Sequence, residues 1–259
     1  MLKSLNSAVS GLQYQQNRLD VIGNNISNIN TVGYRAGRTN AADSFSQVLS
    51  ERSQIGTGVK LAGVTNTFSQ GLINGTGQPY DMAIEGNGFF LVKNSAGETF
   101  ATRAGDFRLD KTGFLVTQDG MKVQGLDGDI SINLGVDGVS WQIQEDGKIM
   151  LSRGPAADGK PQDPKPLGQI KVQNFSDLGL LSKVGGNRFG NLAAAGPEAE
   201  GAPGSAGRGV LRWQSLESSN VDLASQFTDL IVTQRAYQAN SKIITTSDEI
   251  LQELINLKR

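Results

Sequence analysis

The sequence contains no cysteine and no histidine. Disulfide bridges, thiolate sites and histidine-ligated zinc or haem sites are therefore excluded. No apolar run approaches the roughly 18 residues that a membrane-spanning helix needs. The start of the chain, Met1-Leu2-Lys3-Ser4-Leu5, lacks the continuous apolar segment of a cleavable secretory signal. We expect a soluble chain that, if it leaves the cytoplasm, leaves by a route that reads no cleaved signal.

Charge and aromatic content are also low. The 24 Lys and Arg residues nearly balance the 25 Asp and Glu residues, and the net charge is −1. This balance gives no global field that would attract nucleic acid or an anionic membrane, so neither is an expected partner. Aromatic residues make up 6% of the chain, whereas glycine reaches 33 residues without a collagen-like period. Such glycine usage is typical of many tight turns between short strands.

Both ends of the chain have helical periodicity. Apolar residues recur every three or four positions and predict one helix over 3–29 and another over about 222–259. The pattern Ser219-Asn220-Val221-Asp222 is a capping signal for the second helix. A helix on the core of its own domain is the simpler alternative, but we expect a coiled-coil-like assembly interface. Its candidate residues are Leu5, Val9, Leu12, Leu19, Ile26, Phe227, Leu230, Gln234, Tyr237, Ile244 and Leu251.

The middle of the chain reads as β structure. Short apolar runs such as Phe89–Val92 alternate with turn dipeptides such as Asp119-Gly120, which favour antiparallel hairpins. The predicted fold class is α+β, mostly β with terminal helices, and the β module is a sandwich or barrel-like. We expect a helical inner domain from 1–33 and 216–259. A connector with mixed helix and strand signals spans 34–70, and a β-rich outer module spans 71–215, with a small lobe at 126–166.

Candidates for chemistry are weak. Asp127-Gly128-Asp129 resembles a fragment of a calcium loop, but no complete ligand run exists and a hairpin turn explains it better. Gly86-Asn87-Gly88 precedes a strand instead of following one, so it is not a phosphate loop. Asp81 and Glu85 could be posed as the carboxylate pair of a glycosidase, but no aromatic cleft is evident nearby. We expect no enzyme, and we assign no catalytic, cofactor or metal residue.

Five stretches of the sequence resemble the bacterial flagellar rod and hook proteins. They are 18–35, 76–90, 102–107 and, near the end, 216–223 with 233–241. Tyr80 departs from the Leu expected in the second stretch. The residues that carry the family motif are Asn24, Asn25, Asn28, Thr31, Gly33, Tyr34, Asp81, Gly86, Gly88, Phe89, Asn220, Gln234 and Arg235.

The resemblance implies a subunit that is exported by the flagellar type III apparatus and polymerises into a tube of the hook or basal body. Its partners would be further copies of itself and the adjoining rod, hook-cap and hook–filament junction proteins. The terminal helices would form the inner layer. The closing segment 244–259 and residues 56–64 look like the hook protein, whereas the chain length and residues 167–170 suit the distal rod protein. We favour a minimal hook protein over the distal rod protein; a secreted β-domain adhesin with helical arms is the alternative from another class.

Overall fold

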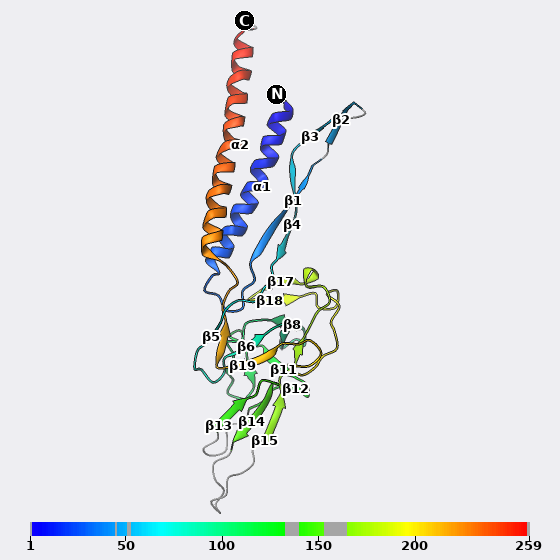
Figure 1. Cartoon of the computed structure of the whole chain (residues 1–259), viewed down its shortest axis with the longest axis vertical. Helices are drawn as coiled ribbons and strands as arrows, with labels where there is room; N and C mark the ends of the chain where they lie inside the picture. The colour runs from blue at the N-terminus through cyan, green and yellow to red at the C-terminus, as the bar shows by residue number, and fades with distance from the viewer. Residues whose placement is uncertain (1, 45, 51–52, 133–139, 153–164, 258–259) are drawn as a thin grey trace, which may run out of the picture. The chain divides into compact units, whose positions relative to one another are not determined.

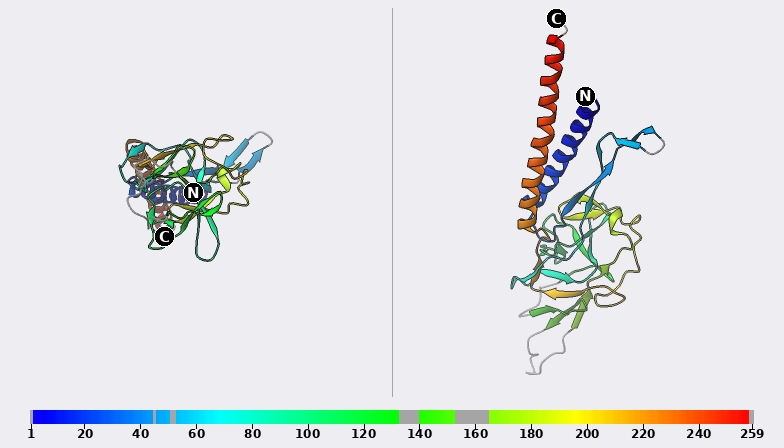
Figure 2. Two further views of the ribbon diagram at one scale, coloured as in Figure 1. Left: turned by 90° about the horizontal axis from the view of Figure 1, so that it is seen from below. Right: turned by 45° about the horizontal axis from the view of Figure 1, so that its top comes forward.

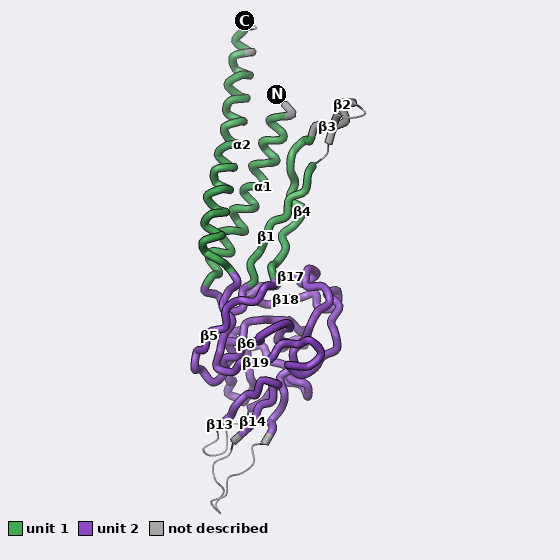
Figure 3. The backbone as a smooth tube through the Cα atoms, viewed as in Figure 1, with its two compact units in different colours: residues 1–29, 35–67, 221–259 green, residues 30–34, 68–220 purple. Residues whose placement is uncertain are grey.

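The computed structural model describes residues 2–44, 46–50, 53–132, 140–152 and 165–257. Figure 3 shows that the chain divides into two compact units. Unit 1 comprises residues 1–29, 35–67 and 221–259, and unit 2 comprises residues 30–34 and 68–220. The chain therefore enters and leaves unit 2 more than once, and each unit draws on segments far apart in the sequence.

Unit 1 combines two long helices with a β ribbon. Helix α1 spans Leu2–Ser27 and helix α2 spans Leu223–Leu257. The two helices lie side by side and antiparallel, and the ribbon lies next to α1 (Figures 1 and 2). The ribbon pairs β1 with β4 and β2 with β3, all antiparallel; their bounds are Gly37–Asp43 for β1, Ser46–Ser50 for β2, Ser53–Gly56 for β3 and Val59–Asn66 for β4.

Helix α2 begins where a side chain caps it. The Oδ1 atom of Asp222 accepts a hydrogen bond from the backbone N–H of Ala224 at 3.1 Å, and the carbonyl of Asp222 accepts from the N–H of Gln226 at 3.0 Å. This is the geometry of an N-cap residue. The cap is therefore Asp222, the last residue of the predicted capping pattern.

Unit 2 is built from antiparallel strands. Its main sheet has the order β17-β18-β8-β7-β11-β10-β9, with β12 paired to β11 and β16 paired to β7. A second sheet contains β13, β14 and β15, and two further pairs join β19 to β6 and β20 to β5. The strands are β5 Ile73–Gly75, β6 Met82–Glu85, β7 Phe89–Lys93, β8 Thr99–Thr102, β9 Arg108–Leu109, β10 Leu115–Val116, β11 Lys122–Gly125, β12 Gly128–Asp129, β13 Ser140–Ile143, β14 Lys148–Ser152, β15 Lys165–Gln169, β16 Val172–Gln173, β17 Ser182–Gly185, β18 Arg188–Gly190, β19 Val210–Trp213 and β20 Ser215–Glu217. A short 3₁₀ turn, Leu178–Leu180, precedes β17.

The core of unit 2 lies on both faces of strand β7. Successive side chains of a strand point to opposite faces, so Phe90 and Val92 pack into one cluster while Phe89 and Leu91 pack into another. The first cluster also contains Trp141 and other residues of the β13–β15 sheet. A strand buried on both faces needs apolar residues at consecutive positions, which explains the run Phe89–Val92.

The α+β class is confirmed: one helix lies near each end of the described chain, and its strand pairs are antiparallel. Within the connector 34–70, where the sequence gives mixed helix and strand signals, residues 46–50 form strand β2. At 130–132, Ser131 forms a bridge to Phe114. The carbonyl of Ile130 accepts from the N–H of Leu115 at 3.0 Å, and the N–H of Ile132 donates to the carbonyl of Gly113 at 2.6 Å. Ile130 and Ile132 are both buried.

The turn predicted at Asp119-Gly120 is confirmed. The N–H of Gly120 donates to the carbonyl of Thr117 at 2.9 Å, and Gly120 has a φ of 80°, which favours glycine. A further dipeptide of this type, Asp137-Gly138, lies outside the described residues. None of the described helices is both long and apolar enough to cross a bilayer.

Candidate functional site

Helices α1 and α2 meet through small and polar side chains. A Cβ atom built on Gly11 would lie 2.7 Å from Nδ2 of Asn240, so the side chain of Asn240 occupies the space beside Gly11. Ala8 in α1 and Thr233 and Ser247 in α2 are all buried. Small residues allow close approach but bury little apolar area, so this contact alone leaves most of the large apolar side chains of both helices outside it.

A network of polar contacts joins the end of α1 to the start of α2. Asn25 in α1 donates from Nδ2 to the carbonyl of Gly37 at 2.9 Å and to Oε1 of Gln226 at 3.0 Å. Its Oδ1 accepts from the N–H of Gly37 at 2.8 Å. About two turns earlier in α1, Arg18 pairs with Asp229 of α2 at 2.9 Å. Asn25 therefore bonds both backbone groups of the first residue of β1 and ties the strand to both helices.

Two outer flanks of α2 carry exposed apolar side chains. On one flank Phe227 is 50% exposed and Ile231 is 58% exposed. On the other, Val232, Ile243 and Ile250 are 53%, 43% and 47% exposed. Positions seven residues apart, such as 243 and 250, share a face of a helix. These residues form two apolar stripes that no described part of unit 1 covers; we call them the outer stripes.

Helix α1 also carries apolar side chains on the side that faces away from the ribbon. A Cβ on Gly37 would meet Val21, and one on Gly58 would meet Ser10, so the ribbon packs on the side of α1 that carries these residues. At 100° per residue, Leu5, Val9 and Leu12 lie on the opposite side. Val9 is 39% exposed there.

The predicted assembly residues divide by exposure. Val9, Phe227, Gln234 and Tyr237 are exposed, whereas Leu5, Leu12, Leu19, Ile26, Leu230, Ile244 and Leu251 are half-buried. The structure brings Leu230 and Ile244 onto the side of α2 that also carries Thr233 and Ser247. Sequence reasoning missed Val232, Ile243 and Ile250; the seven-residue interval between Ile243 and Ile250 was the signal that could have identified them.

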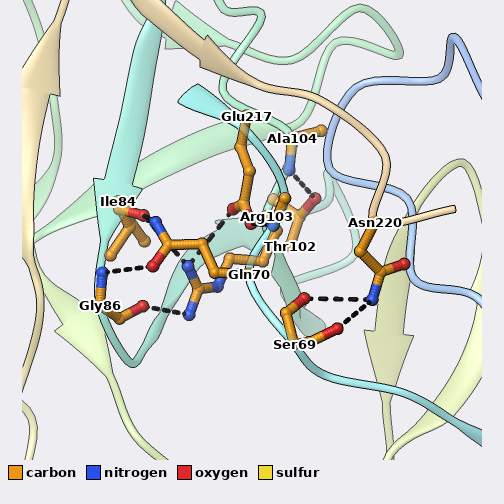
Figure 4. Close-up of polar contacts among 10 residues, drawn as sticks. Ser69, Gln70, Ile84, Gly86, Thr102, Arg103, Ala104, Glu217 and Asn220 are labelled. Carbon is orange, nitrogen blue, oxygen red and sulfur yellow. Dashed lines mark hydrogen bonds and ion pairs between the residues drawn. The ribbon is translucent and has the colours of Figure 1, made fainter. Parts of the chain in front are cut away.

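Several motif residues gather in unit 2 around a buried ion pair. Arg103 and Glu217 approach to 3.4 Å between Nη1 and Oε2, with side chains 6% and 0% exposed (Figure 4). Arg103 also donates from Nη2 to the carbonyl of Gly86 at 2.7 Å and from Nη1 to that of Ile84 at 3.2 Å. Oε1 of Glu217 accepts from the N–H of Gly71 at 2.9 Å. The two charges are thus bonded to each other and to backbone, as buried charges require.

The N-terminal motif reaches the same cluster through backbone contacts. Gly33 donates from its N–H to the carbonyl of Glu217 at 2.8 Å. Gly33 has a φ of 67°, and a Cβ there would lie 2.5 Å from the backbone nitrogen of Ala104. Only glycine fits that conformation and that gap. Tyr34 follows, accepting on its carbonyl from the N–H of Asn220 at 3.4 Å, and its N–H donates to the carbonyl of Thr31 at 3.3 Å.

The buried side chain of Tyr34 contacts Lys183. The ammonium of Lys183 lies 4.3 Å from the ring centroid. Desolvation raises the pKa of Tyr34 and lowers the pKa of Lys183. The pair is therefore a packed cation–π contact, and it holds residues 30–34 against strand β17.

The motif in residues 76–90 contributes side chains both to the core and to the surface of unit 2. Phe89 packs edge-on against Phe175 and Phe189, and Arg103 lies 5.2 Å from its ring centroid. Gly88 precedes it in a buried position. Asp81 accepts from the hydroxyl of Thr76 at 2.6 Å. These contacts give the motif a structural role. Glu85 is the second carboxylate of the glycosidase pair considered above, and it forms an ion pair with Arg212 at 2.6 Å.

The remaining motif residues lie on the two helices or just outside them. Asn28 donates from Nδ2 to the carbonyl of Asn24 at 2.8 Å, near the end of α1. Asn220 donates from Nδ2 to Ser69. Gln234 and Arg235 are exposed on α2. Arg103 and Glu217 were missed as site residues, although a charge inside an otherwise apolar or turn-rich motif is the signal that could have identified them.

Three family models match the chain. Residues 5–35 match "Flagella basal body rod protein", residues 83–151 match "Flagellar hook protein FlgE/F/G D1 domain", and residues 214–257 match "Flagellar basal body rod FlgEFG protein C-terminal". The first and last of these cover the two helices with their flanking motifs, and the second falls within unit 2.

Full-length relatives agree with these matches. The chain is 43% identical to the flagellar basal-body rod protein FlgG of Bacillus subtilis (strain 168), with 100% of both chains covered. It is 36% identical to the flagellar basal-body rod protein FlgG of Caulobacter vibrioides, over 99% of this chain and 100% of that protein. It is 26% identical to the flagellar hook protein FlgE of Borreliella burgdorferi, with 100% of both covered in an alignment of 442 residues.

These identities favour the rod over the hook, which reverses the preference drawn from residues 244–259. The hook alignment extends over 442 positions for a chain of 259 residues, so it contains long gaps, whereas the Bacillus subtilis alignment needs only 272. The family is structural and not enzymatic. The chain belongs to the family of flagellar basal-body rod and hook proteins and is a structural subunit of the flagellar axis.

Proposed function

We propose that this chain is a subunit of the flagellar rod, in its distal section, and that it polymerises into a rigid tube through helices α1 and α2. The observation that supports the rod is the end-to-end similarity to basal-body rod proteins at 36–43% identity. The observation that supports polymerisation is the pair of outer stripes on α2. Exposed apolar area of this kind marks an interaction surface.

In this proposal the outer stripes of α2 and the apolar side of α1 become buried only between copies. Burial of a Phe or Ile side chain stabilises a contact by about 1.5–3 kcal/mol. Several such residues in one stripe are enough to drive association of helices into a coiled-coil-like inner layer. Unit 2 would then be carried as the outer layer. Contacts between two different surfaces repeat without closing and produce a helical tube.

The same proposal implies a route of export for the subunit and contacts with other axial proteins. We expect the subunit to pass through the flagellar type III apparatus without cleavage of a signal peptide. In the axis it would contact other axial proteins at the ends of the tube segment that it builds, and it would lie across the periplasm as part of the basal body.

A deletion strain distinguishes the rod from the hook. We expect loss of this chain to remove the distal rod together with the hook that is built on it, as seen in electron micrographs of purified basal bodies. Basal bodies that keep a full-length rod and lack only the hook would refute the rod assignment.

Purified protein tests polymerisation directly. Phe227→Asp should abolish tubes in negative-stain images, because a carboxylate would be buried without a partner. Thr228→Asp is the matched control, since it adds the same charge at the adjacent exposed position of α2. Tubes of normal length from Phe227→Asp would contradict the role of this stripe.

A further inference from the structure

A cleft in unit 1 lies between the two helices and the first strand of the ribbon. It has a volume of about 460 Å³, within the range of pockets that take a ligand or a few side chains. Val21 and Ile22 of α1 form part of its wall. Polar groups of all three elements surround them, including Arg18, Gln226 and Thr39.

The charge of the cleft is positive. Two arginines, Arg18 and Arg38, line it together with one carboxylate, Asp229. Arg18 pairs with Asp229 at 2.9 Å, so those two charges balance. Arg38 is exposed at the start of β1 and supplies the remaining positive charge. An acidic group that enters the cleft would therefore find a cation and several amide and hydroxyl donors.

The last turns of α2 have the complementary character. The segment 243–257 contains three carboxylates, Asp248, Glu249 and Glu253, and no Lys or Arg. It also carries apolar side chains with large exposed fractions: 47% for Ile250, 66% for Ile255 and 82% for Leu257. The segment is acidic, which matches the positive charge of the cleft.

The end of α2 extends past the helix that packs beside it. Gly11 lies opposite Asn240, and Asn25 lies opposite Gln226. In an antiparallel pair this register places Leu2, the first residue of α1, opposite about residue 249. Residues 250–257 therefore run beyond the start of α1, as Figure 1 shows. Within the described chain no helix lies beside them.

The same molecule cannot fill its own cleft with this segment. Asp229 lines the cleft, and Glu253 lies 24 residues further along one uninterrupted helix. At 1.5 Å per residue, the two positions are about 36 Å apart. The occupant must come from a second copy that is displaced along the helix direction. A contact of this kind joins two different surfaces, so it repeats from copy to copy without closing.

We infer that residues 248–257 of α2 in one copy dock into the cleft formed by α1, α2 and β1 of the next copy, with the carboxylates of Glu249 and Glu253 at Arg38. This inference rests on the proposed polymerisation and names the partner segment of one of its contacts. Because the charges are partly exposed, salt screens them and should weaken the contact.

A charge exchange tests the inference. The variant Arg38→Glu and the double variant Glu249→Lys/Glu253→Lys should each raise the critical concentration for tube formation by about threefold to tenfold, since loss of a partly exposed ion pair costs on the order of 1 kcal/mol. The combination of all three changes should restore the critical concentration to within about twofold of the starting protein. A combined variant that assembles no better than the weaker parent would overturn the inference. Arg108→Glu, at an exposed position of unit 2, is the matched control for an added negative charge.

Cross-linking gives a second readout that does not depend on the energy of the contact. The chain has no cysteine, so Arg38→Cys/Glu253→Cys contains only the two introduced thiols. Oxidation of assembled tubes should join successive copies into covalent ladders, because within one copy Glu253 lies about 36 Å along α2 from Asp229, which lines the same cleft as Arg38. Arg108→Cys/Glu253→Cys should give no ladder. Normal tubes without a ladder from the Arg38→Cys pair would overturn the docking and leave the proposed function standing, whereas failure of the unmodified protein to form tubes would refute the proposed function itself.

Discussion

Gly11 of α1 packs against Asn240 of α2 so closely that a Cβ atom at position 11 would lie 2.7 Å from Nδ2 and 3.3 Å from Cγ of Asn240. Both of these atoms belong to a side chain that can rotate. The variant Gly11→Leu cannot be accommodated by that rotation and should destabilise unit 1 by about 1–3 kcal/mol, measured by thermal unfolding followed through helical circular dichroism.

A change at Asn240 should make a side chain at position 11 tolerable. Asn240→Ala removes the atoms that an added Cβ would meet, so Gly11→Ala in that background should gain the better helix propensity of Ala, about 1 kcal/mol. A Gly11→Ala effect of equal size with and without Asn240→Ala would show that the two residues do not constrain each other.

The buried ion pair of unit 2 should be sensitive to removal of one partner. Glu217→Ala leaves Arg103 charged and buried, and it should cost about 3–5 kcal/mol of unfolding free energy. Urea unfolding followed by tryptophan fluorescence measures this, because the two tryptophans of the chain, Trp141 and Trp213, both lie in unit 2. Glu200→Ala breaks the more exposed Lys171–Glu200 pair and should cost less than about 1 kcal/mol. Equal losses would contradict the structural role of the buried pair.

Gly33 should not tolerate a side chain. Gly33→Ala combines an unfavourable left-handed backbone, about 1–2 kcal/mol, with a collision against the backbone of Arg103 and Ala104. Gly77→Ala is the matched control, because Gly77 has a similar φ of 70° and nothing within 4 Å of the added Cβ. Gly77→Ala should therefore show the backbone cost alone. The same fluorescence assay separates the two, and equal destabilisation would argue against the close contact at Gly33.

Two carboxyls of unit 2 should respond to pH in opposite directions. Burial raises the pKa of Asp106, and the neighbouring charges of Asp81 and Asp119 act in the same direction. The stability linked to Asp106 is therefore present below its ordinary pKa and is lost as the pH rises through the raised value. Asp106→Asn should stabilise unit 2 at neutral pH, and this gain should shrink as the solution is acidified.

Asp129 is the opposite case. Hydrogen bonds from Gln124 at 2.6 Å and Lys122 at 2.9 Å lower the pKa of Asp129. Its contribution is present above the ordinary pKa and is lost as the pH falls through the lowered value. Asp129→Asn should therefore destabilise unit 2 at neutral pH and have little effect in acid. Unfolding free energies measured across this pH range check both variants, and changes of the same sign would contradict the assignments.

Parts of the fold could be predicted because their signal is local. The run Phe89–Val92 predicted a buried strand, and the periodicity of both ends predicted helices close to the observed α1 and α2. In the ribbon, Val59, Leu61 and Val64 indicate strand β4. Its partner β1 was not recognised, since it reads Gly-Arg-Thr-Asn-Ala-Ala-Asp and has no apolar alternation. Its position depends on Asn25, which supplies hydrogen bonds that no periodicity reveals.

The candidate site could be predicted only in part. Arg103 and Glu217 are 114 positions apart, so their pairing depends on the tertiary fold. Periodicity identified apolar stripes on the helices but could not show which stripe faces the other helix of the same copy. The structure buries Thr233 and Ser247 and leaves Phe227 and Val232 exposed.

The central claim is that the outer stripes of α2 are interfaces between copies. Cryo-electron microscopy of tubes grown from the purified chain measures this most directly. The account predicts tubes in which Phe227, Ile231, Ile243 and Ile250 of every subunit contact a second copy within the inner layer. Tubes held together through unit 2, with these four side chains facing solvent, would contradict it.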